Sequence, residues 1–226
     1  MEVKQLVLDA NRWIVEKGLV SLTWGNVSAL DASSAALIIK PSGISLKEAT
    51  EKDMSVVAWD GSLLDGKKPS VDTPTHLELY ERFPEVRCVV HTHSKYGTIF
   101  AQANRSVPCL GTTHADYFAG DIPCVPHPNE NQINTDYEMF TGRIIGEYFK
   151  KNSLNYNHIP GCIVQGHGVF TWGETIDKAL ETAYVLELVA EMAFKTLALD
   201  SYSYLADFVA EKHFARKHGQ TSYYGQ

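Results

Sequence analysis

The sequence contains few cysteines, and none of them form a close pair. Cys88, Cys109, Cys124 and Cys162 are scattered over 226 residues without a C-x-x-C motif. A zinc ribbon and a dithiol redox motif both need such pairs, so neither is indicated. We expect four reduced thiols, most of them buried.

Long hydrophobic runs are also absent. No stretch approaches the roughly 18 to 20 consecutive apolar residues that cross a bilayer, and the start, MEVKQLVLDANRW, lacks the apolar core of a signal peptide. With 44% hydrophobic residues, the chain is long enough to bury a substantial core. We expect one domain over residues 1–226, a cytoplasmic location and no membrane partner.

Positive charge is scarce as well. The formal net charge is -7, and the one short basic segment is EKHFARKHG near the end of the chain. A nucleic-acid surface needs an extended basic patch. The sequence therefore predicts no nucleic-acid partner.

Helix and strand patterns alternate along the chain. Apolar residues recur at helical spacing over 3–17, 134–151 and 174–199, and Thr73-Pro74 is typical of a helix start with Thr73 as its cap. Short apolar runs with turn residues predict strands within 21–31, 35–43, 54–66, 85–93 and 161–168. Because many strands come early and are joined by short turns, we expect a largely antiparallel sheet covered by helices.

The segment RCVVHTHSKYG places His91 and His93 two residues apart on a predicted strand. Such side chains point to the same face, with Cα atoms roughly 6 to 7 Å apart. That spacing suits two nitrogens about 2.0 to 2.1 Å from one metal ion. Histidines this close also occur in ordinary strands, hydrogen-bonded to their neighbours, so the spacing alone leaves both interpretations open.

Two further residues are candidate ligands of the same ion. His167 ends another apolar strand between two glycines, which permit close backbone approach. Asp72 is a carboxylate just before the predicted helix start. Nitrogen and oxygen ligands suit Zn²⁺, and they also suit Mn²⁺ or Co²⁺.

A group of turn residues offers hydrogen-bond donors to an oxyanion such as a phosphate. These residues are Gly25, Asn26, Ser42 and Gly43, with Lys40 nearby. Their backbone N–H groups and side chains can cradle an anion. The same residues are typical of plain turns, and the sequence alone does not decide between the two.

Eight motifs run in order over essentially the whole chain: LTWGNVSALD, IKPSG, PSVDTPTHLELY, VVHTHS, GTTHADYF, DIPC, GHGVFTWG and KHFARKHGQTSYYGQ. Together they resemble the class II aldolase/adducin family, and within it the L-ribulose-5-phosphate 4-epimerases. The resemblance implies an α/β fold, a three-layer α/β/α sandwich with a mostly antiparallel central sheet. It also implies a divalent metal, usually zinc, and a homotetramer with active sites between subunits.

The resemblance further implies roles for individual residues. It assigns two proton transfers to Asp116 and Tyr224, and it places His213, Arg216 and Glu138 near the site. Without it, Asp116 is typical of a turn or cap carboxylate, Tyr224 of a mobile tail and Glu138 of a solvated helix carboxylate. His114 is placed either to orient Asp116 or to serve another role, whereas His76 is expected on a helix face and His127, His158 and His218 on the surface.

Phosphate binding in the family also uses a Ser-Ser pair just before the metal-binding aspartate. Here the pair is Ser70-Val71, so one hydroxyl is lost and the expected phosphate affinity is weaker or the preferred ligand altered. We predict that Ser70, Val71 and Arg216 join the turn residues in binding a sugar phosphate.

The chemistry that the resemblance implies can be derived from the substrate. The hydrogen at C4 of a 2-ketopentose 5-phosphate is not acidic, because it is not next to the carbonyl. Transient oxidation needs a nicotinamide-binding loop, but GHGVFT has Thr171 where the third glycine of G-x-G-x-x-G would fall, so we expect no NAD. Retro-aldol cleavage between C3 and C4 remains, and a divalent ion stabilises the enediolate charge.

Three functions stay open. The first is a 4-epimerase that interconverts L-ribulose 5-phosphate and D-xylulose 5-phosphate. The second is a class II sugar-phosphate aldolase. Aldolase relatives usually carry a glutamate near the position of Asp72, so Asp72 favours the epimerase, and the YYGQ ending favours it as well. The third is a noncatalytic binding domain like the adducin head, which is expected to lack the full histidine set.

Overall fold

The computed structural model describes residues 3–31, 33, 35–201, 203–218 and 222–223. Its centre is an eight-stranded sheet in the order β4-β3-β2-β1-β5-β8-β7-β6. The strands are β1 Asn26–Asp31, β2 Ala36–Ile39, β3 Ser55–Val57, β4 Leu63–Asp65, β5 Cys88–Thr92, β6 Cys124–Val125, β7 Gly161–Val164 and β8 Val169–Gly173. The β6–β7 pair is parallel and the other pairs are antiparallel, so the mostly antiparallel sheet is confirmed as a mixed one.

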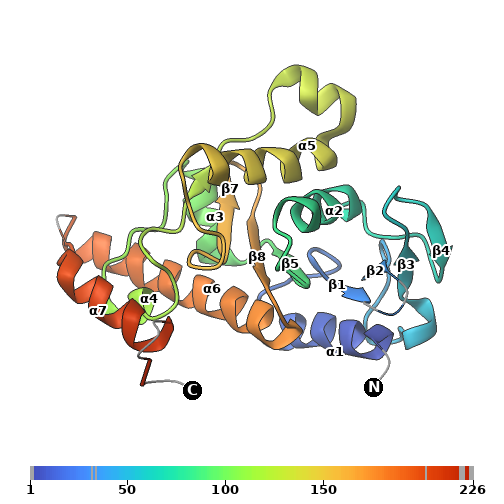
Figure 1. Cartoon of the computed structure of the whole chain (residues 1–226), viewed down its shortest axis with the longest axis horizontal. Helices are drawn as coiled ribbons and strands as arrows, with labels where there is room; N and C mark the ends of the chain where they lie inside the picture. The colour runs from blue at the N-terminus through green and yellow to red at the C-terminus, as the bar shows by residue number, and fades with distance from the viewer. Residues whose placement is uncertain (1–2, 32, 34, 202, 219–221, 224–226) are drawn as a thin grey trace.

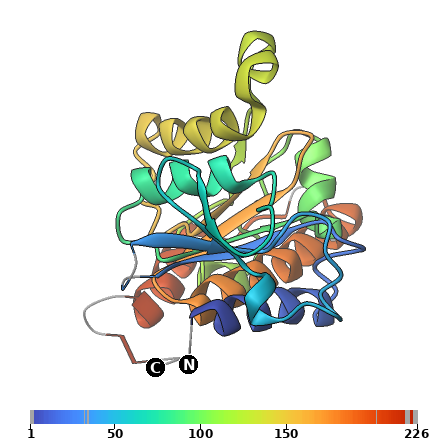
Figure 2. The same cartoon turned by 90° about the vertical axis from the view of Figure 1, so that its right-hand side faces the viewer.

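Helices cover both faces of this sheet, which confirms the three-layer arrangement. They are α1 Val3–Glu16, α2 Thr73–Arg82, α3 Lys95–Gln102, α4 Thr112–Ala115, α5 Glu130–Lys151, α6 Ile176–Leu199 and α7 Asp207–His218, with a short 3-10 helix at Glu51–Asp53. Helices α2 and α5 lie on one face, and α1 and α6 lie on the other (Figure 1, Figure 2).

The alternation of side chains along β5 determines which of its residues lie on each face of the sheet. Cys88 and Val90 pack in a cluster with α1 and α6, whereas Val89 belongs to the main core cluster, which includes Leu79 of α2. Successive strand residues point to opposite faces, so His91 points to the same side as Val89. The first of the predicted ligands therefore faces α2, the helix that Asp72 precedes.

Helix α2 begins one residue from the expected cap. Asp72 is the N-cap and Thr73 is already helical, so the prediction of Thr73 as the cap is wrong. The Thr73 hydroxyl donates to the Ser70 carbonyl, 2.6 Å away, rather than accepting from a helix N–H. The carboxylate of Asp72 thus sits at a helix N-terminus, where the helix dipole favours negative charge.

Helix α5 is broken near its start. The sequence predicts a helix over 134–151, but α5 runs over Glu130–Lys151 and is interrupted at Asp136, whose φ of -161° and ψ of 89° are not helical. The part before the break projects away from the body, and the part after it lies along α2 (Figure 1, Figure 2). Gly142 allows this contact, since a Cβ there would lie 2.6 Å from the Thr75 carbonyl oxygen.

The structure also describes the four cysteines and the character of the helices. All four cysteines are free; Cys88 and Cys162 are buried, and Cys109 and Cys124 are half-buried. Among the residues that the structure describes, none of the helices combines the length and the apolar character needed to cross a bilayer.

Candidate metal and substrate site

Strand β5 and the β7–β8 turn bring three histidines together. His91 Nε2 lies 3.1 Å from His93 Nε2. His167, in the turn, completes a group whose candidate ligand atoms all lie within 4.8 Å of one another. The structure therefore gathers the three predicted histidines at one point, which is the geometry that a shared metal ion needs.

The imidazoles of this group are neutral and oriented. His91 Nδ1 donates to the Val169 carbonyl oxygen at 2.9 Å, which leaves the lone pair of Nε2 facing His93. Burial lowers the pKa of His91 and His93, and burial together with the neighbouring rings lowers the pKa of His167 to about 3. Three unprotonated rings near neutral pH are what a divalent cation requires.

Asp72 lies beside this group rather than within it, since the described ligand atoms that lie within 4.8 Å of one another are those of the three histidines. The Asn26 side-chain amide donates to Asp72 Oδ2 at 2.7 Å, and Asn26 is the register partner of His91 in the β1–β5 pair. Burial alone would raise the pKa of Asp72, but the charge that the nearby histidines carry when protonated, His91 foremost, and the hydrogen bond from Asn26 outweigh it and leave the pKa below its usual value. The carboxylate is therefore ionised near neutral pH and available to a cation.

The backbone around the group is shaped for a crowded centre. A Cβ on Gly168 would lie 2.7 Å from the Thr92 carbonyl oxygen and 3.2 Å from His93 Cδ2, so only glycine fits. The surrounding segment forms the turn between two antiparallel strands, β7 and β8. With three neutral nitrogens and one carboxylate, the residues present fit Zn²⁺, and they fit Mn²⁺ or Co²⁺ as well.

Three of the predicted phosphate-binding residues adjoin Asp72. Asn26 donates to the Ser70 hydroxyl at 3.0 Å, and the Ser70 N–H donates to the Lys40 carbonyl at 3.1 Å. Burial lowers the pKa of Lys40, whose side chain is 3% exposed, and the charge of Asp72 partly offsets this. An amide and a hydroxyl thus lie beside the candidate ligand, while the Lys40 ammonium donates to the Thr23 carbonyl at 3.1 Å.

The other predicted phosphate-binding residues lie on the loops around this group. Gly25 has a φ of +74°, and a Cβ there would lie 2.7 Å from the His91 carbonyl oxygen. Gly43 has a φ of +66°, and the exposed Ser42 uses its N–H on the Lys68 carbonyl at 3.0 Å. Val71 is 59% exposed. Their part in binding a substrate stays a prediction.

Asp116 belongs to a second group of charged residues. It follows α4 and is held by α7: Arg216 donates from Nε and Nη2 to the two carboxylate oxygens at 3.1 and 2.8 Å, and His213 Nδ1 lies 3.0 Å away. Burial would raise the pKa of Asp116, but these two partners outweigh it and lower the pKa. The result is an ionised carboxylate in a fixed orientation.

The structure does not bring this second group to the histidines. Within the described ranges, the Asp116 side chain forms hydrogen bonds with residues of α7, which packs against α4. His114 does not orient Asp116 either, since its Nε2 bonds the Gly120 carbonyl at 2.9 Å. Arg216 stays a predicted substrate-binding residue, and Tyr224 lies outside the described residues.

Two contacts in these groups involve residues that the sequence did not single out for the site. The Tyr137 hydroxyl lies 3.1 Å from His167 Nδ1, and Tyr137 falls within the segment predicted as a helix over 134–151. His218, expected on the surface, is exposed but also bonds the Asp116 carbonyl at 2.8 Å. Asp136, just before Tyr137, is a residue type that often caps helices. It is the one sequence signal for a new helix start at this position.

Comparison with known proteins gives relatives over the whole chain. The family model for the class II aldolase and adducin N-terminal domain matches residues 5–194. L-ribulose-5-phosphate 4-epimerase UlaF from Salmonella paratyphi B is 44% identical over 227 aligned positions, covering 100% of this chain and 99% of that protein. The protein of the same name from Salmonella typhi has the same identity and coverage.

Solved structures share the fold at lower identity. An L-fuculose 1-phosphate aldolase superimposes with a TM-score of 0.78 at 20% identity, covering 95% of each chain. YgbL from Escherichia coli, described as a putative aldolase/epimerase/decarboxylase, gives a TM-score of 0.74 at 22% identity, covering 94% of this chain and 97% of that one. At these identities the likeness concerns the fold alone.

Proposed function

The chain belongs to the class II aldolase and adducin family, and on that premise we propose that it is a metal-dependent L-ribulose-5-phosphate 4-epimerase. It interconverts L-ribulose 5-phosphate and D-xylulose 5-phosphate. The observation that carries the proposal is the convergence of three neutral histidines beside Asp72. The two Salmonella relatives, which align over the whole chain, carry that activity in their names and support it.

His91, His93, His167 and Asp72 are proposed to hold the metal, which we take to be Zn²⁺, with Mn²⁺ or Co²⁺ as alternatives. When bound, such an ion supplies a Lewis acid that stabilises negative charge as it develops on the sugar oxygens. The family resemblance and the donor set support this assignment.

The proposed reaction breaks and remakes one carbon–carbon bond. A base removes the proton of the C4 hydroxyl, the C3–C4 electron pair moves toward the C2 carbonyl, and an enediolate and glycolaldehyde phosphate result. The aldehyde turns its other face toward C3, the bond forms again, and an acid returns a proton to the new C4 oxygen. Atoms and electrons balance, and no redox cofactor is needed.

Asp116 and Tyr224 are the proposed proton-transfer groups, one for each face of the aldehyde. Asp116 is ionised and can accept a proton, while Arg216 and His213 fix its direction. An unperturbed tyrosine has a pKa of about 10 and is suited to return a proton.

The phosphate group is proposed to lie against Gly25, Asn26, Lys40, Ser42, Gly43, Ser70 and Val71, with Arg216 as a further contact. The adjacency of Asn26, Lys40 and Ser70 to Asp72 supports this placement, because the phosphate of a five-carbon sugar must lie near its reacting carbons. A buried lysine beside polar donors is a favourable partner for a charged oxyanion.

The active enzyme is proposed to be a homotetramer with active sites between subunits. Asp116 is held by α7 while the histidines face α2, which supports a site in which a second copy of the chain supplies Asp116. We take residues 1–226 as one domain in the cytoplasm. A charged sugar phosphate does not cross a bilayer unaided, which agrees with that location.

The decisive experiment is an epimerase assay coupled to detection of D-xylulose 5-phosphate. The purified protein should convert L-ribulose 5-phosphate without added nicotinamide, lose activity with a chelator and regain it with Zn²⁺. In deuterated water the C4 hydrogen should be retained, and deuterium at C4 would rule out cleavage. Accumulation of dihydroxyacetone and glycolaldehyde phosphate would instead identify an aldolase, and no turnover would leave a binding domain.

A further inference from the structure

The junction between α2 and α5 holds two residues at the histidine group. Asp72 is the N-cap of α2, and Tyr137 is the first residue of α5 after the break at Asp136. Asp72 is a proposed metal ligand, and Tyr137 contacts the ring of His167. The role of Tyr137 is not accounted for by substrate binding or by the proton transfers proposed above.

The contact of Tyr137 determines which nitrogen of His167 is free. Its hydroxyl oxygen lies 3.1 Å from Nδ1, and the two ring centroids are 5.7 Å apart. A neutral imidazole carries one proton, so if Nδ1 donates to the phenol oxygen, Nε2 keeps its lone pair. His91 is fixed in the same way by its Nδ1 bond to the Val169 carbonyl.

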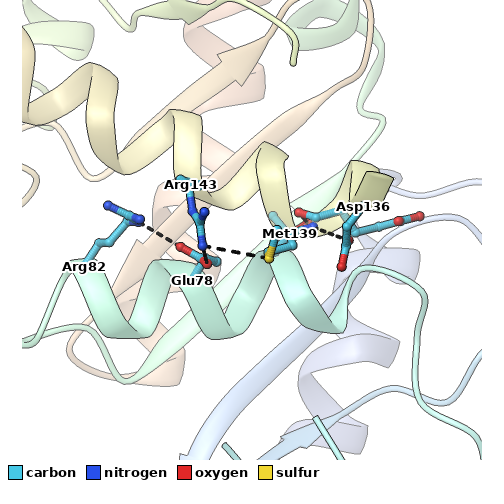
Figure 3. Close-up of polar contacts among 7 residues, drawn as sticks. Glu78, Arg82, Asp136, Met139 and Arg143 are labelled. Carbon is cyan, nitrogen blue, oxygen red and sulfur yellow. Dashed lines mark hydrogen bonds and ion pairs between the residues drawn. The ribbon is translucent and has the colours of Figure 1, made fainter. Parts of the chain in front are cut away.

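The backbone fixes where Tyr137 stands. Asp136 accepts a hydrogen bond from the Met139 N–H at 3.0 Å (Figure 3). Asp136 is therefore the cap of the second part of α5, and Tyr137 is the first residue of that part. The Thr75 hydroxyl donates to the Glu138 carbonyl at 2.6 Å. The first turn of α2 is thereby tied to the residue next to Tyr137.

Further along, charged side chains hold the two helices together. Glu78 of α2 accepts from Arg82 at 2.9 Å and from Arg143 of α5 at 3.0 Å (Figure 3). Gly142 permits the close approach, because a Cβ there would lie 2.7 Å from Glu78 Cβ. The helix pair therefore sets the positions of Asp72 and Tyr137 as one rigid unit.

We propose that Tyr137 is a positioning residue, whose phenol oxygen accepts the Nδ1–H of His167 and thereby holds Nε2 toward the shared metal ion. The inference rests on the metal site proposed above. Partners that fix the tautomer and ring direction of a metal-binding histidine typically change metal affinity by about 10- to 100-fold. The break in α5 thus places a residue that raises the affinity of the site for the metal ion.

The test compares Tyr137→Phe with Tyr148→Phe in the full chain. Phenylalanine keeps the ring and removes only the hydroxyl, and Tyr148 lies about three turns further along the same helix. In Zn²⁺ competition against a chromophoric chelator, Tyr137→Phe should bind Zn²⁺ about 10- to 100-fold more weakly than wild type. Tyr148→Phe should match wild type, and equal affinities for all three proteins would overturn the inference.

A spectroscopic measurement separates positioning from a general structural effect. In the Co²⁺-loaded wild-type protein, the Nδ1–H protons of His91 and His167 should give two shifted signals that exchange slowly with solvent. Tyr137→Phe should lose slow exchange for one signal and keep the other. Loss of both signals or of neither would overturn the role of Tyr137.

A second pair of variants keeps the inference testable if Tyr137→Phe does not fold. Asp136→Asn keeps an acceptor for the Met139 N–H and should bind Zn²⁺ like wild type, whereas Asp136→Ala should bind it more weakly. Equal affinity in this pair would overturn the inference. Failure of the wild-type protein to bind Zn²⁺ at all would overturn the proposed metal site, a distinct result from a wild-type site that is insensitive to Tyr137.

Discussion

Gly168 and Thr92 approach so closely that a Cβ on the glycine would lie 2.7 Å from the threonine carbonyl oxygen. This contact joins the β7–β8 turn to the end of β5, and so it sets the position of His167 relative to His91 and His93. The close approach of the two backbones at Gly168 and Thr92 therefore helps to set the geometry of the histidine group.

We expect Gly168→Ala to destabilise the metal-free protein by about 1 to 3 kcal/mol, because the added carbon forces the two strands apart. It should also weaken Zn²⁺ binding, since the histidines lie on the two displaced segments. Urea unfolding in chelator and a Zn²⁺ titration measure the two effects. Gly111→Ala is the matched control, because a Cβ there meets nothing within 4 Å; a similar loss in both variants would contradict the explanation.

The strand-borne part of the site follows from sequence periodicity. The two-residue repeat of β5 predicts that His91 and His93 share a face, and their Nε2 atoms lie 3.1 Å apart. The flanking glycines of His167 predict a tight turn, and Gly168 fits only as glycine. Local rules suffice here because strand geometry and turn geometry are determined within a few residues.

The rest depends on contacts between distant segments, which periodicity does not reveal. The capping of α5 at Asp136 lies inside an uninterrupted helical pattern, so the break and the place of Tyr137 are set by packing on α2. The pairing of Asp116 with Arg216 spans 100 positions in the chain. Neither contact has a signature in the local pattern of apolar residues.

Val71 gives a prediction about substrate affinity. It is 59% exposed and precedes Asp72, at the position where the family resemblance expects a second serine. We expect Val71→Ser to lower KM for L-ribulose 5-phosphate up to about 10-fold, since a hydrogen bond to a charged group contributes about 1.5 to 3 kcal/mol and ordering the side chain offsets part of this. Steady-state kinetics measure it, with Val15→Ser on the exposed side of α1 as control. An unchanged KM would mean that a hydroxyl at this position does not reach the phosphate.

His114 gives a prediction about pH. Burial lowers its pKa to about 4, whereas an unfolded histidine titrates near 6.5. Between these values the unfolded chain binds more protons than the folded one, so the contribution to stability is complete above about pH 6.5 and is lost as the pH falls toward 4. The loss from this residue is at most about 3 kcal/mol.

We expect His114→Gln to reduce that acid sensitivity. The glutamine amide can still donate to the Gly120 carbonyl, which His114 bonds at 2.9 Å, but it does not titrate. Urea unfolding of both proteins in chelator at pH 8, 6 and 5 should show the stability of wild type falling more steeply than that of the variant. If the stabilities of wild type and variant fell equally with pH, His114 would be protonated at a similar pH in the folded and unfolded states.

The separation of Asp116 from the histidines gives a prediction about assembly. His93→Asn should remove metal binding, and Asp116→Asn should remove the charge that Arg216 and His213 hold in place, so each variant alone should be inactive. If each active site takes its histidines from one subunit and Asp116 from another, mixed oligomers contain some sites with both intact. Random assembly of equal amounts should restore about a quarter of wild-type turnover.

The restored turnover must come from exchange of subunits, which supplies its own control. Mixing the variants under mild denaturant and then diluting should allow exchange, whereas mixing them after chemical cross-linking of each homo-oligomer should leave them inactive. Because neither chain carries both a metal site and Asp116, activity in the exchanged sample can arise only where two chains meet. A mixture that stays inactive despite confirmed exchange would mean that Asp116 serves the histidines of its own chain, and would require α4 and α7 to move toward β5.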